Sequence, residues 1–168
     1  MIIPLSKPWL TEIEAKKTYN SVMSGWLTQS GSDVTLMEKN LRIFANSNDV
    51  NLDVAATSNG STALHLALMA CGIGKGDEVL VPDFSYAATI NSILLVGATP
   101  VLIKPNKSTF NLDLENTRQA INENTKAMLA VDNYGNFEEY AELKKLSGNK
   151  IKIIQDAAES FPNNLVQS

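Results

Sequence analysis

The sequence lacks several features that large classes of proteins require. It has one cysteine, Cys71, which excludes an intrachain disulfide and a cysteine-built metal site. It has one histidine, His65, so a metal site built from two histidines is excluded. The longest apolar run, Ile93–Ile103, is interrupted by glycine and proline and is too short to span a membrane as a helix. Because no basic segment precedes a long apolar core, we expect no secretion signal, no membrane partner and a cytoplasmic location.

The net charge and the length of the chain exclude further classes of protein. The 168 residues include 14 Lys and Arg against 18 Asp and Glu, a formal net charge of -4. The basic residues are scattered, which argues against a nucleic-acid partner. The length and the hydrophobic content of 44% exclude disordered and fibrous proteins and predict one domain, with at most a short addition. A glycine-rich dinucleotide fingerprint, a Walker loop and a Ser-His-Asp arrangement are also missing.

Periodicity predicts three helices in the first part of the chain. Residues 11–24 form the first, where Thr11 and Glu14 have the spacing of a capping box. The second covers residues 33–45, and three apolar side chains are expected on its inner side: Leu36, Leu41 and Phe44. The third, residues 61–70, is apolar on most of its circumference and is therefore expected to be buried, with His65 as a hydrogen-bonded core residue.

The rest of the chain alternates between strands and helices. Four short apolar runs predict strands at residues 78–81, 100–103, 127–131 and 151–154. Helical stretches lie between them at residues 86–96, 113–122 and 137–146. Continuously hydrophobic strands separated by helices are typical of a mostly parallel sheet with helices on both faces, so the predicted fold class is α/β.

Ligands of such sheets bind at the carboxyl ends of strands and at the helix N-termini that face them. The first candidate is the segment 58–64, where Gly60 would let a ligand approach and Ser61 and Thr62 would add hydroxyl groups at the start of a helix. This segment is interpreted either as a phosphate-binding turn or as an ordinary helix cap, because caps prefer the same residues.

Two further candidates follow predicted strands. Tyr86, with Phe84 beside it, could stack on a planar ring or could pack in the core. Asp156 ends the last apolar strand, where a carboxylate is costly unless a cation or hydrogen bonds compensate it. A protonated heterocyclic nitrogen would be a suitable cation, and a helix-capping aspartate is the alternative.

Six motifs occur together in the order and spacing of one family: residues 4–8, 24–29, 60–68, 76–79, 91–101 and 156–160. On these motifs the chain resembles the N-terminal half of the DegT/DnrJ/StrS-type sugar aminotransferases, which use pyridoxal phosphate (PLP) and have the aspartate-aminotransferase fold, type I. The resemblance implies that residues 1–168 form the N-terminal part of the PLP-binding large domain. It also implies that the C-terminal small domain is absent.

The resemblance assigns roles to single residues around the cofactor. Gly60, Ser61 and Thr62 match the turn that binds the phosphate of PLP. Tyr86 has the position of the aromatic residue that stacks on the pyridine ring. Asp156 matches the acid that pairs with the protonated ring nitrogen and so keeps PLP an effective electron sink.

The resemblance also implies roles nearer the substrate. Glu159 stands where the family has Gln or Glu near the ring hydroxyl, and Thr28 and Gln29 lie in a segment that lines the substrate pocket. The Schiff-base lysine of the family lies beyond the motif of Asp156, so no lysine of this chain is expected to take that role. Lys150 and Lys152 precede Asp156 on its strand and are expected to lie away from the ring.

Two functions follow as hypotheses. The first is a truncated sugar aminotransferase homologue whose ancestral reaction moves an amino group from glutamate to a nucleotide-linked keto-sugar, in polysaccharide or amino-sugar biosynthesis. Without the lysine it would be inactive alone and would bind PLP weakly. The alternative is a non-catalytic binding or assembly subunit that pairs with a full-length aminotransferase. Because an open sheet edge and uncovered apolar surface favour association, we expect a homodimer or a complex with a full-length homologue.

Overall fold

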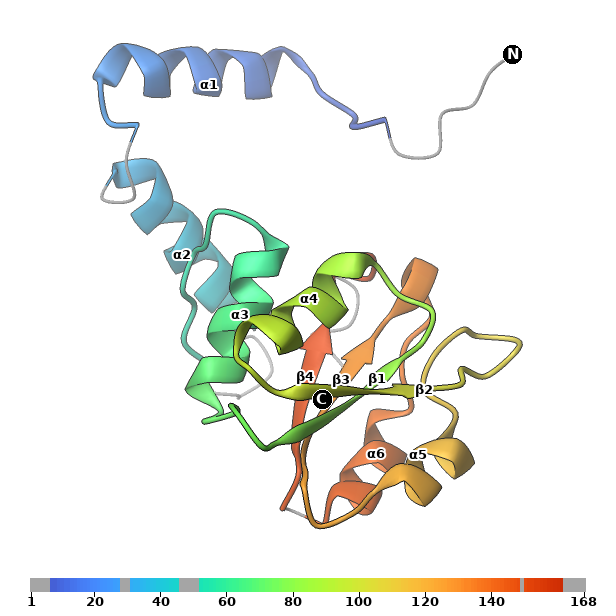
Figure 1. Cartoon of the computed structure of the whole chain (residues 1–168). Helices are drawn as coiled ribbons and strands as arrows, with labels where there is room; N and C mark the ends of the chain where they lie inside the picture. Colours follow the sequence, from blue (N-terminus) through green and yellow to red (C-terminus); the bar gives the residue numbers. More distant parts are fainter. Residues whose placement is uncertain (1–6, 28–30, 46–51, 149, 162–168) are drawn as a thin grey trace. The chain divides into compact units, whose positions relative to one another are not determined.

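The computed structural model describes residues 7–27, 31–45, 52–148 and 150–161 (Figure 1). The chain divides into two compact units, residues 1–56 and residues 57–168.

The first unit contains α1 (Glu12–Ser24) and α2 (Ser32–Ala45). The predicted capping box is confirmed at α1, because the Thr11 hydroxyl accepts from the Ile13 amide at 3.2 Å and the Glu14 carboxylate accepts from the Thr11 amide at 2.7 Å. The Thr11 hydroxyl and the Thr11 amide both donate to the Glu14 carboxylate, and these two hydrogen bonds lower the pKa of Glu14. The helix ends at Gly25, whose φ of 75° is in the left-handed region that glycine adopts without strain.

The predicted inner side of α2 is wrong for two of its residues. Leu36 is 52% exposed and Phe44 is 42% exposed, whereas Ala45 is the buried residue of this helix. α1 has no buried residue in the part of the unit that the structure describes. A pair of helices offers too little apolar surface to bury one face of each, so the described residues of this unit form amphipathic helices without a hydrophobic core cluster.

The second unit is built on a four-stranded parallel sheet in the order β2-β1-β3-β4 (Figure 1). Its strands are β1 (Glu78–Pro82), β2 (Thr99–Ile103), β3 (Thr125–Val131) and β4 (Lys152–Asp156). All four predicted strands are therefore confirmed. The apolar residues of the central strands β1 and β3 are buried on both faces, as a parallel sheet between helices requires, whereas Leu102 of the edge strand β2 is exposed.

Helices cover both faces of this sheet, as predicted. α3 (Gly60–Ala70) and α4 (Ala87–Leu95) lie on one face, and α5 (Leu114–Ala120) and α6 (Tyr140–Ser147) lie on the other (Figure 1). Successive side chains of a strand point to opposite faces, so Val79 and Val81 enter the core under α3 and α4 while Leu80 enters the core on the other side.

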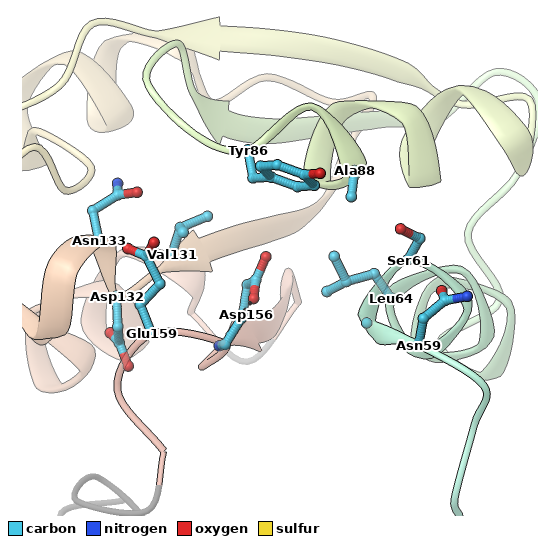
Figure 2. Close-up of a pocket in the computed structure, with 12 residues that line it drawn as sticks. Asn59, Ser61, Leu64, Tyr86, Ala88, Val131, Asp132, Asn133, Asp156 and Glu159 are labelled. Atoms are coloured by element: carbon cyan, nitrogen blue, oxygen red, sulfur yellow. Dashed lines mark hydrogen bonds between the residues drawn. The ribbon is translucent and has the colours of Figure 1, made fainter. Parts of the chain in front are cut away.

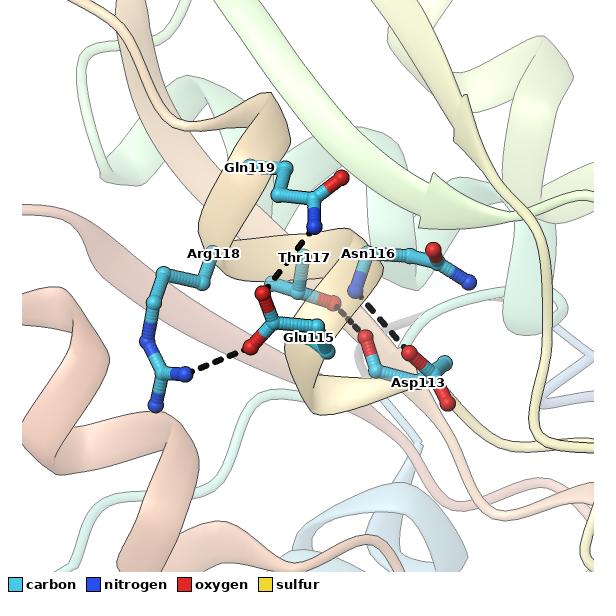
Figure 3. Close-up of polar contacts among 6 residues, drawn as sticks. All are labelled: Asp113, Glu115, Asn116, Thr117, Arg118 and Gln119. Carbon is cyan, nitrogen blue, oxygen red and sulfur yellow. Dashed lines mark hydrogen bonds and ion pairs between the residues drawn. The ribbon is translucent and has the colours of Figure 1, made fainter.

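Polar residues define the start of α5 (Figure 3). The Asp113 carboxylate accepts from the Asn116 amide at 2.9 Å, which caps the first turn. The buried Thr117 hydroxyl donates to the Asp113 carbonyl at 2.7 Å, and Glu115 forms an ion pair with Arg118 at 2.7 Å. Local hydrogen bonds therefore set the beginning of this helix.

The expectation that the apolar helix α3 is buried all round is wrong. Leu64 and Leu68 are buried against the sheet, but Leu66 is 47% exposed and Met69 is 59% exposed. His65 is partly exposed as well, so it is not a core residue. Within the second unit, α3 lies on one face of the sheet and beside α4, so only the side of α3 that contacts them is buried.

Because one side of α3 is buried and the other is exposed, the same Leu→Ala substitution should have very different effects on the two sides. We expect Leu68→Ala to lower the free energy of unfolding by about 2–5 kcal/mol, because it leaves a cavity in a fully buried position. Leu66→Ala, two residues away on the exposed side, should change it by no more than about 0.5 kcal/mol. Urea denaturation followed by circular dichroism measures both. Equal losses in the two variants would contradict this assignment of the faces.

Candidate functional site

A hollow of about 380 Å³ lies at the carboxyl ends of β1, β3 and β4, beside the first turn of α3 (Figure 2). The chain goes from β1 through α4 to the edge strand β2 and then returns across β1 to form β3. The hollow therefore lies at the place where the strand order reverses, the usual ligand site of an open α/β sheet. The following residues line it: Asn59, Gly60, Ser61, Leu64, Tyr86, Ala88, Val131, Asp132, Asn133, Asp156, Ala158 and Glu159.

The first turn of α3 combines a helix cap with an open backbone. The Asn59 side chain accepts from the Thr62 amide at 2.9 Å and from the Thr62 hydroxyl at 3.1 Å. Thr62 thus belongs to the cap, which fits the alternative interpretation, and it is not among the lining residues. Gly60 and Ser61 do line the hollow, and a Cβ added to Gly60 would meet no atom within 4 Å. Their first-turn amides have no intrahelical acceptor and can therefore bind an anion.

Tyr86 lies between β1 and α4 and is 80% exposed. The alternative that it packs in the core is therefore wrong. Figure 2 shows its ring along the border of the hollow, across from Asp156. Such an exposed ring can stack on a planar ligand.

Asp156 is the last residue of β4, and two donors orient its carboxylate. The hydroxyl of Thr89, a fully buried residue of α4, donates to Oδ2 at 3.0 Å, and the Ala158 amide donates to Oδ1 at 3.2 Å. The Ala158 bond closes a local turn, and the described residues up to Phe161 contain no helix that Asp156 would cap. A carboxylate can accept about four hydrogen bonds, so the two oxygens of Asp156 retain capacity for a cationic donor in the hollow.

Glu159 lies at the end of the hollow opposite Asn59 and Ser61 (Figure 2). Its carboxylate accepts from the Tyr134 amide at 2.6 Å. The lining residues include three acids, Asp132, Asp156 and Glu159, and no basic residue among those that the structure describes. The hollow therefore favours a ligand with an anionic end at α3 and a positive charge near Asp156.

Sequence reasoning missed Asp132, which directly follows β3. It is fully buried, and among the described residues four groups from different parts of the unit donate hydrogen bonds to its carboxylate. The donors are the Glu138 amide at 2.9 Å, the Tyr140 hydroxyl at 2.9 Å, the Gln155 amide group at 2.8 Å and the Ser160 hydroxyl at 2.7 Å. The signal was present, because Asp132 ends an apolar strand just as Asp156 does.

Burial next to Asp132 changes the titration of two neighbours. Desolvation raises the pKa of Glu138 to about 7, and the nearby Asp132 charge adds to the increase, although the Leu112 amide donates to this carboxylate at 3.0 Å. Desolvation and the charge of Asp132 also raise the pKa of the Tyr140 phenol. Below pH 7 Glu138 is therefore mainly protonated in the folded chain.

This pKa predicts a pH-dependent stability. The ordinary pKa of a glutamate is 4.5 and that of folded Glu138 is about 7, so the folded chain binds the extra proton between these values. The free energy of unfolding should therefore fall by about 3 kcal/mol as the pH rises from 4.5 to 7, because each pKa unit corresponds to about 1.4 kcal/mol. Above pH 7 it should level off. Urea denaturation should show this loss in the wild type and in the exposed control Glu123→Gln, but not in Glu138→Gln. An unchanged pH dependence in Glu138→Gln would refute the assignment.

Of the predicted site residues, five line the one hollow: Gly60, Ser61, Tyr86, Asp156 and Glu159. Thr62 lies one residue outside it, and Thr28 and Gln29 lie outside the described residues. The binding roles assigned to all of them stay predictions. The described residues include no helix long and apolar enough to cross a membrane, and in the same residues no group of three or more His, Cys, Asp or Glu side chains could hold a metal ion.

The sequence matches the DegT/DnrJ/EryC1/StrS aminotransferase family over residues 9–167. It is 36% identical to GDP-perosamine synthase of Escherichia coli O157:H7 over 162 residues, which are 95% of this chain and 43% of that enzyme. It is also 36% identical over 132 residues to UDP-2-acetamido-2-deoxy-3-oxo-D-glucuronate aminotransferase of Pseudomonas aeruginosa, covering 78% of this chain and 36% of the enzyme.

Solved structures show the same fold. An aminotransferase from Psychrobacter cryohalolentis superposes with a TM-score of 0.85 at 28% identity, over 95% of this chain and 40% of that one. GDP-4-keto-6-deoxymannose-3-dehydratase with a trapped PLP-glutamate geminal diamine superposes with a TM-score of 0.84 at 27% identity, over 96% of this chain and 43% of the enzyme. The sequence thus spans well under half the length of these relatives.

Proposed function

This chain belongs to the DegT/DnrJ/EryC1/StrS aminotransferase family, and on that premise we propose that it supplies the PLP-binding site of a sugar aminotransferase. We call the residues of this site, Gly60, Ser61, Tyr86, Asp156 and Glu159, the cradle. In this proposal residues 1–168 are the N-terminal part of the PLP-binding large domain. The observation that carries it is the convergence of Gly60, Tyr86 and Asp156, from three separate elements, on one hollow at the strand ends. The related GDP-4-keto-6-deoxymannose-3-dehydratase was solved with a trapped PLP-glutamate geminal diamine, which supports this cofactor.

The residues of the hollow fit PLP at both of its charged ends. The first-turn amides of Gly60 and Ser61 would hold the phosphate, and the exposed ring of Tyr86 would stack on the pyridine. The Asp156 carboxylate would accept from the ring nitrogen and so favour its protonated form. Bound PLP with a protonated nitrogen supplies an electron sink for the carbanion that amino transfer requires.

Thr89 acts through Asp156 in this proposal. Its buried hydroxyl fixes one carboxylate oxygen at 3.0 Å, while the Ala158 amide fixes the other at 3.2 Å. A carboxylate held by two donors loses little rotamer freedom when it receives a third. Glu159 is held in the same way by the Tyr134 amide and would face the ring oxygen of PLP.

We propose that no lysine of this chain forms the covalent bond, or tether, to PLP. The lining residues that the structure describes include no lysine. Lys152 is exposed at the opposite end of β4, about 13 Å from Asp156 at a rise of roughly 3.3 Å per residue. We therefore propose that this chain alone holds PLP without a covalent bond and does not turn over.

The substrate class that we propose is a nucleotide-linked keto-sugar, with glutamate as the amino donor. Several relatives carry such nucleotides in their names, among them GDP-perosamine synthase and the UDP-linked glucuronate aminotransferase. The same fold also occurs in a sugar dehydratase. The cradle itself would serve both reactions, because each begins by binding PLP.

Exposed apolar residues favour the second candidate function, a non-catalytic subunit that pairs with a full-length homologue or a second copy. The outer sides of α3 and α4 carry four such residues: Leu66, Met69, Leu94 and Leu95. Uncovered apolar surface of this kind favours association. PLP binding separates the two candidates, because a subunit that only assembles has no need of the cofactor.

Mutation of the cradle should weaken PLP binding in a graded way. We expect Asp156→Asn to weaken it by about 10- to 100-fold, because a charge-assisted hydrogen bond is lost. Thr89→Val should weaken it by about 3- to 10-fold, since the hydrogen bond that orients the Asp156 carboxylate is lost while the carboxylate itself remains. Equilibrium dialysis with absorbance detection measures the dissociation constant.

Thr117→Val is the matched control for Thr89→Val. Thr117 is also fully buried, but its hydroxyl bonds the Asp113 carbonyl on the other face of the sheet. This variant should bind PLP like the wild type. If no variant alters the affinity, or if the wild type does not bind PLP at all, the proposed cradle is wrong.

Reduction with borohydride tests the absence of a tether. We expect intact-mass analysis of the chain with PLP and borohydride to show only partial labelling, spread over exposed lysines and unaffected by Asp156→Asn. One lysine labelled completely in the wild type, with that label lost in Asp156→Asn, would mean that the chain does carry the tether.

A further inference from the structure

Three aromatic rings from separate loops lie together at the carboxyl edge of the sheet. Phe84 follows β1, Phe110 lies between β2 and α5, and Tyr134 follows β3. The ring centroids of Phe84 and Phe110 are 4.9 Å apart, and those of Phe84 and Tyr134 are 6.3 Å apart. We call these three residues the aromatic platform.

The platform is exposed although its rings touch one another. Phe84 is 41% exposed, Phe110 is 39% exposed and Tyr134 is 64% exposed. Rings that serve only the core are normally removed from water, and large aromatic surface left exposed at a fixed site is typical of binding sites. A flat ligand that stacked on these rings would bury the aromatic surface that the protein leaves exposed.

The backbone holds these rings in place. The side-chain amide of Asn133, itself 5% exposed, donates to the Phe84 carbonyl at 3.1 Å and to the Phe110 carbonyl at 2.9 Å. Phe110 and Tyr134 have φ values of 63° and 53°, a left-handed conformation that non-glycine residues rarely adopt. The fold maintains two unfavourable conformations here, and such strain clusters at functional sites.

The platform adjoins the candidate cofactor hollow. Asn133, which joins the Phe84 and Phe110 loops, also lines the hollow, and the Tyr134 amide donates to Glu159 on the same wall. Figure 2 shows Asn133 and Glu159 at the end away from Asn59 and Ser61. A ligand on the platform would therefore extend toward the end of the hollow that the proposed phosphate site does not use.

The chemistry of the platform matches a nucleotide. Aromatic side chains stack on any nucleobase because every base has a flat π-face. Lys104 and Lys107 are exposed on the loop that carries Phe110, and their positive charges suit a diphosphate. Relatives act on both GDP- and UDP-linked compounds according to their names, and a stacking surface accepts both bases.

We infer that the aromatic platform binds the nucleobase of the nucleotide-linked sugar, so that the sugar itself reaches the hollow. This inference rests on the proposed function and adds to it the residues that bind the substrate's nucleotide. Phe84 and Phe110 supply the stacking faces, and Asn133 is a positioning residue that holds their loops.

Calorimetric titration of the full chain with GDP, UDP and ribose 5-phosphate tests the inference. GDP and UDP should bind, and ribose 5-phosphate, which has no base, should bind at least about tenfold more weakly. The double variant Phe84→Leu/Phe110→Leu keeps apolar packing but removes the rings, and it should lose about tenfold or more in GDP affinity. The control Tyr19→Leu removes a ring that is 63% exposed on α1 and should leave GDP affinity unchanged.

The outcomes separate this inference from the proposed function. PLP binding is measured by dialysis on the same samples, and circular dichroism verifies that the variants fold. Wild-type chain that binds PLP but not GDP, or a double variant with wild-type GDP affinity, would overturn the platform alone. A double variant that changes the light-scattering mass but not GDP affinity would show that the rings form a contact between copies, and it too would overturn the inference. Failure of PLP binding would overturn the proposed function instead.

Discussion

The buried carboxylate of Asp132 is the interaction on which the arrangement of the strand ends depends. It lies just beyond β3 and accepts from the backbone after β3, from α6, from β4 and from the turn that follows β4. A fully buried charge is costly without such donors, so these four groups are strongly constrained to surround it. Two of these donors, Gln155 and Ser160, directly flank Asp156 and Glu159, which line the hollow.

Two aspartates at neighbouring strand ends thus have opposite roles. Val131 and Asp156 are partners in the parallel register, so Asp132 lies next to Asp156 at the same edge. Asp132 is fully buried and accepts from four groups among the described residues, whereas Asp156 is partly exposed and accepts from Thr89 and Ala158. The difference in burial, not the residue type, makes one carboxylate structural and leaves the other available to a ligand.

The sequence predicts local structure and strand ends well, and distant contacts poorly. The capping box of Thr11 and the four strands follow from patterns within a few residues, whereas the site positions of Tyr86 and Asp156 needed the family resemblance, because the local pattern left alternatives open. The donors of Asp132 and the contact of Phe84 with Phe110 come from segments 6 to 28 residues apart, which no short pattern contains. The exposed sides of α2 and α3 were mispredicted because apolar periodicity shows which face could be buried, not whether a partner covers it.

The cradle is most directly tested by a crystal structure of the full chain grown with saturating PLP. The phosphate is expected at the Gly60 and Ser61 amides, the ring beneath Tyr86, and the ring nitrogen within hydrogen-bond distance of Asp156. An empty hollow at saturating PLP, or PLP bound at another place on the molecule, would contradict the central claim that these strand ends form one cofactor site.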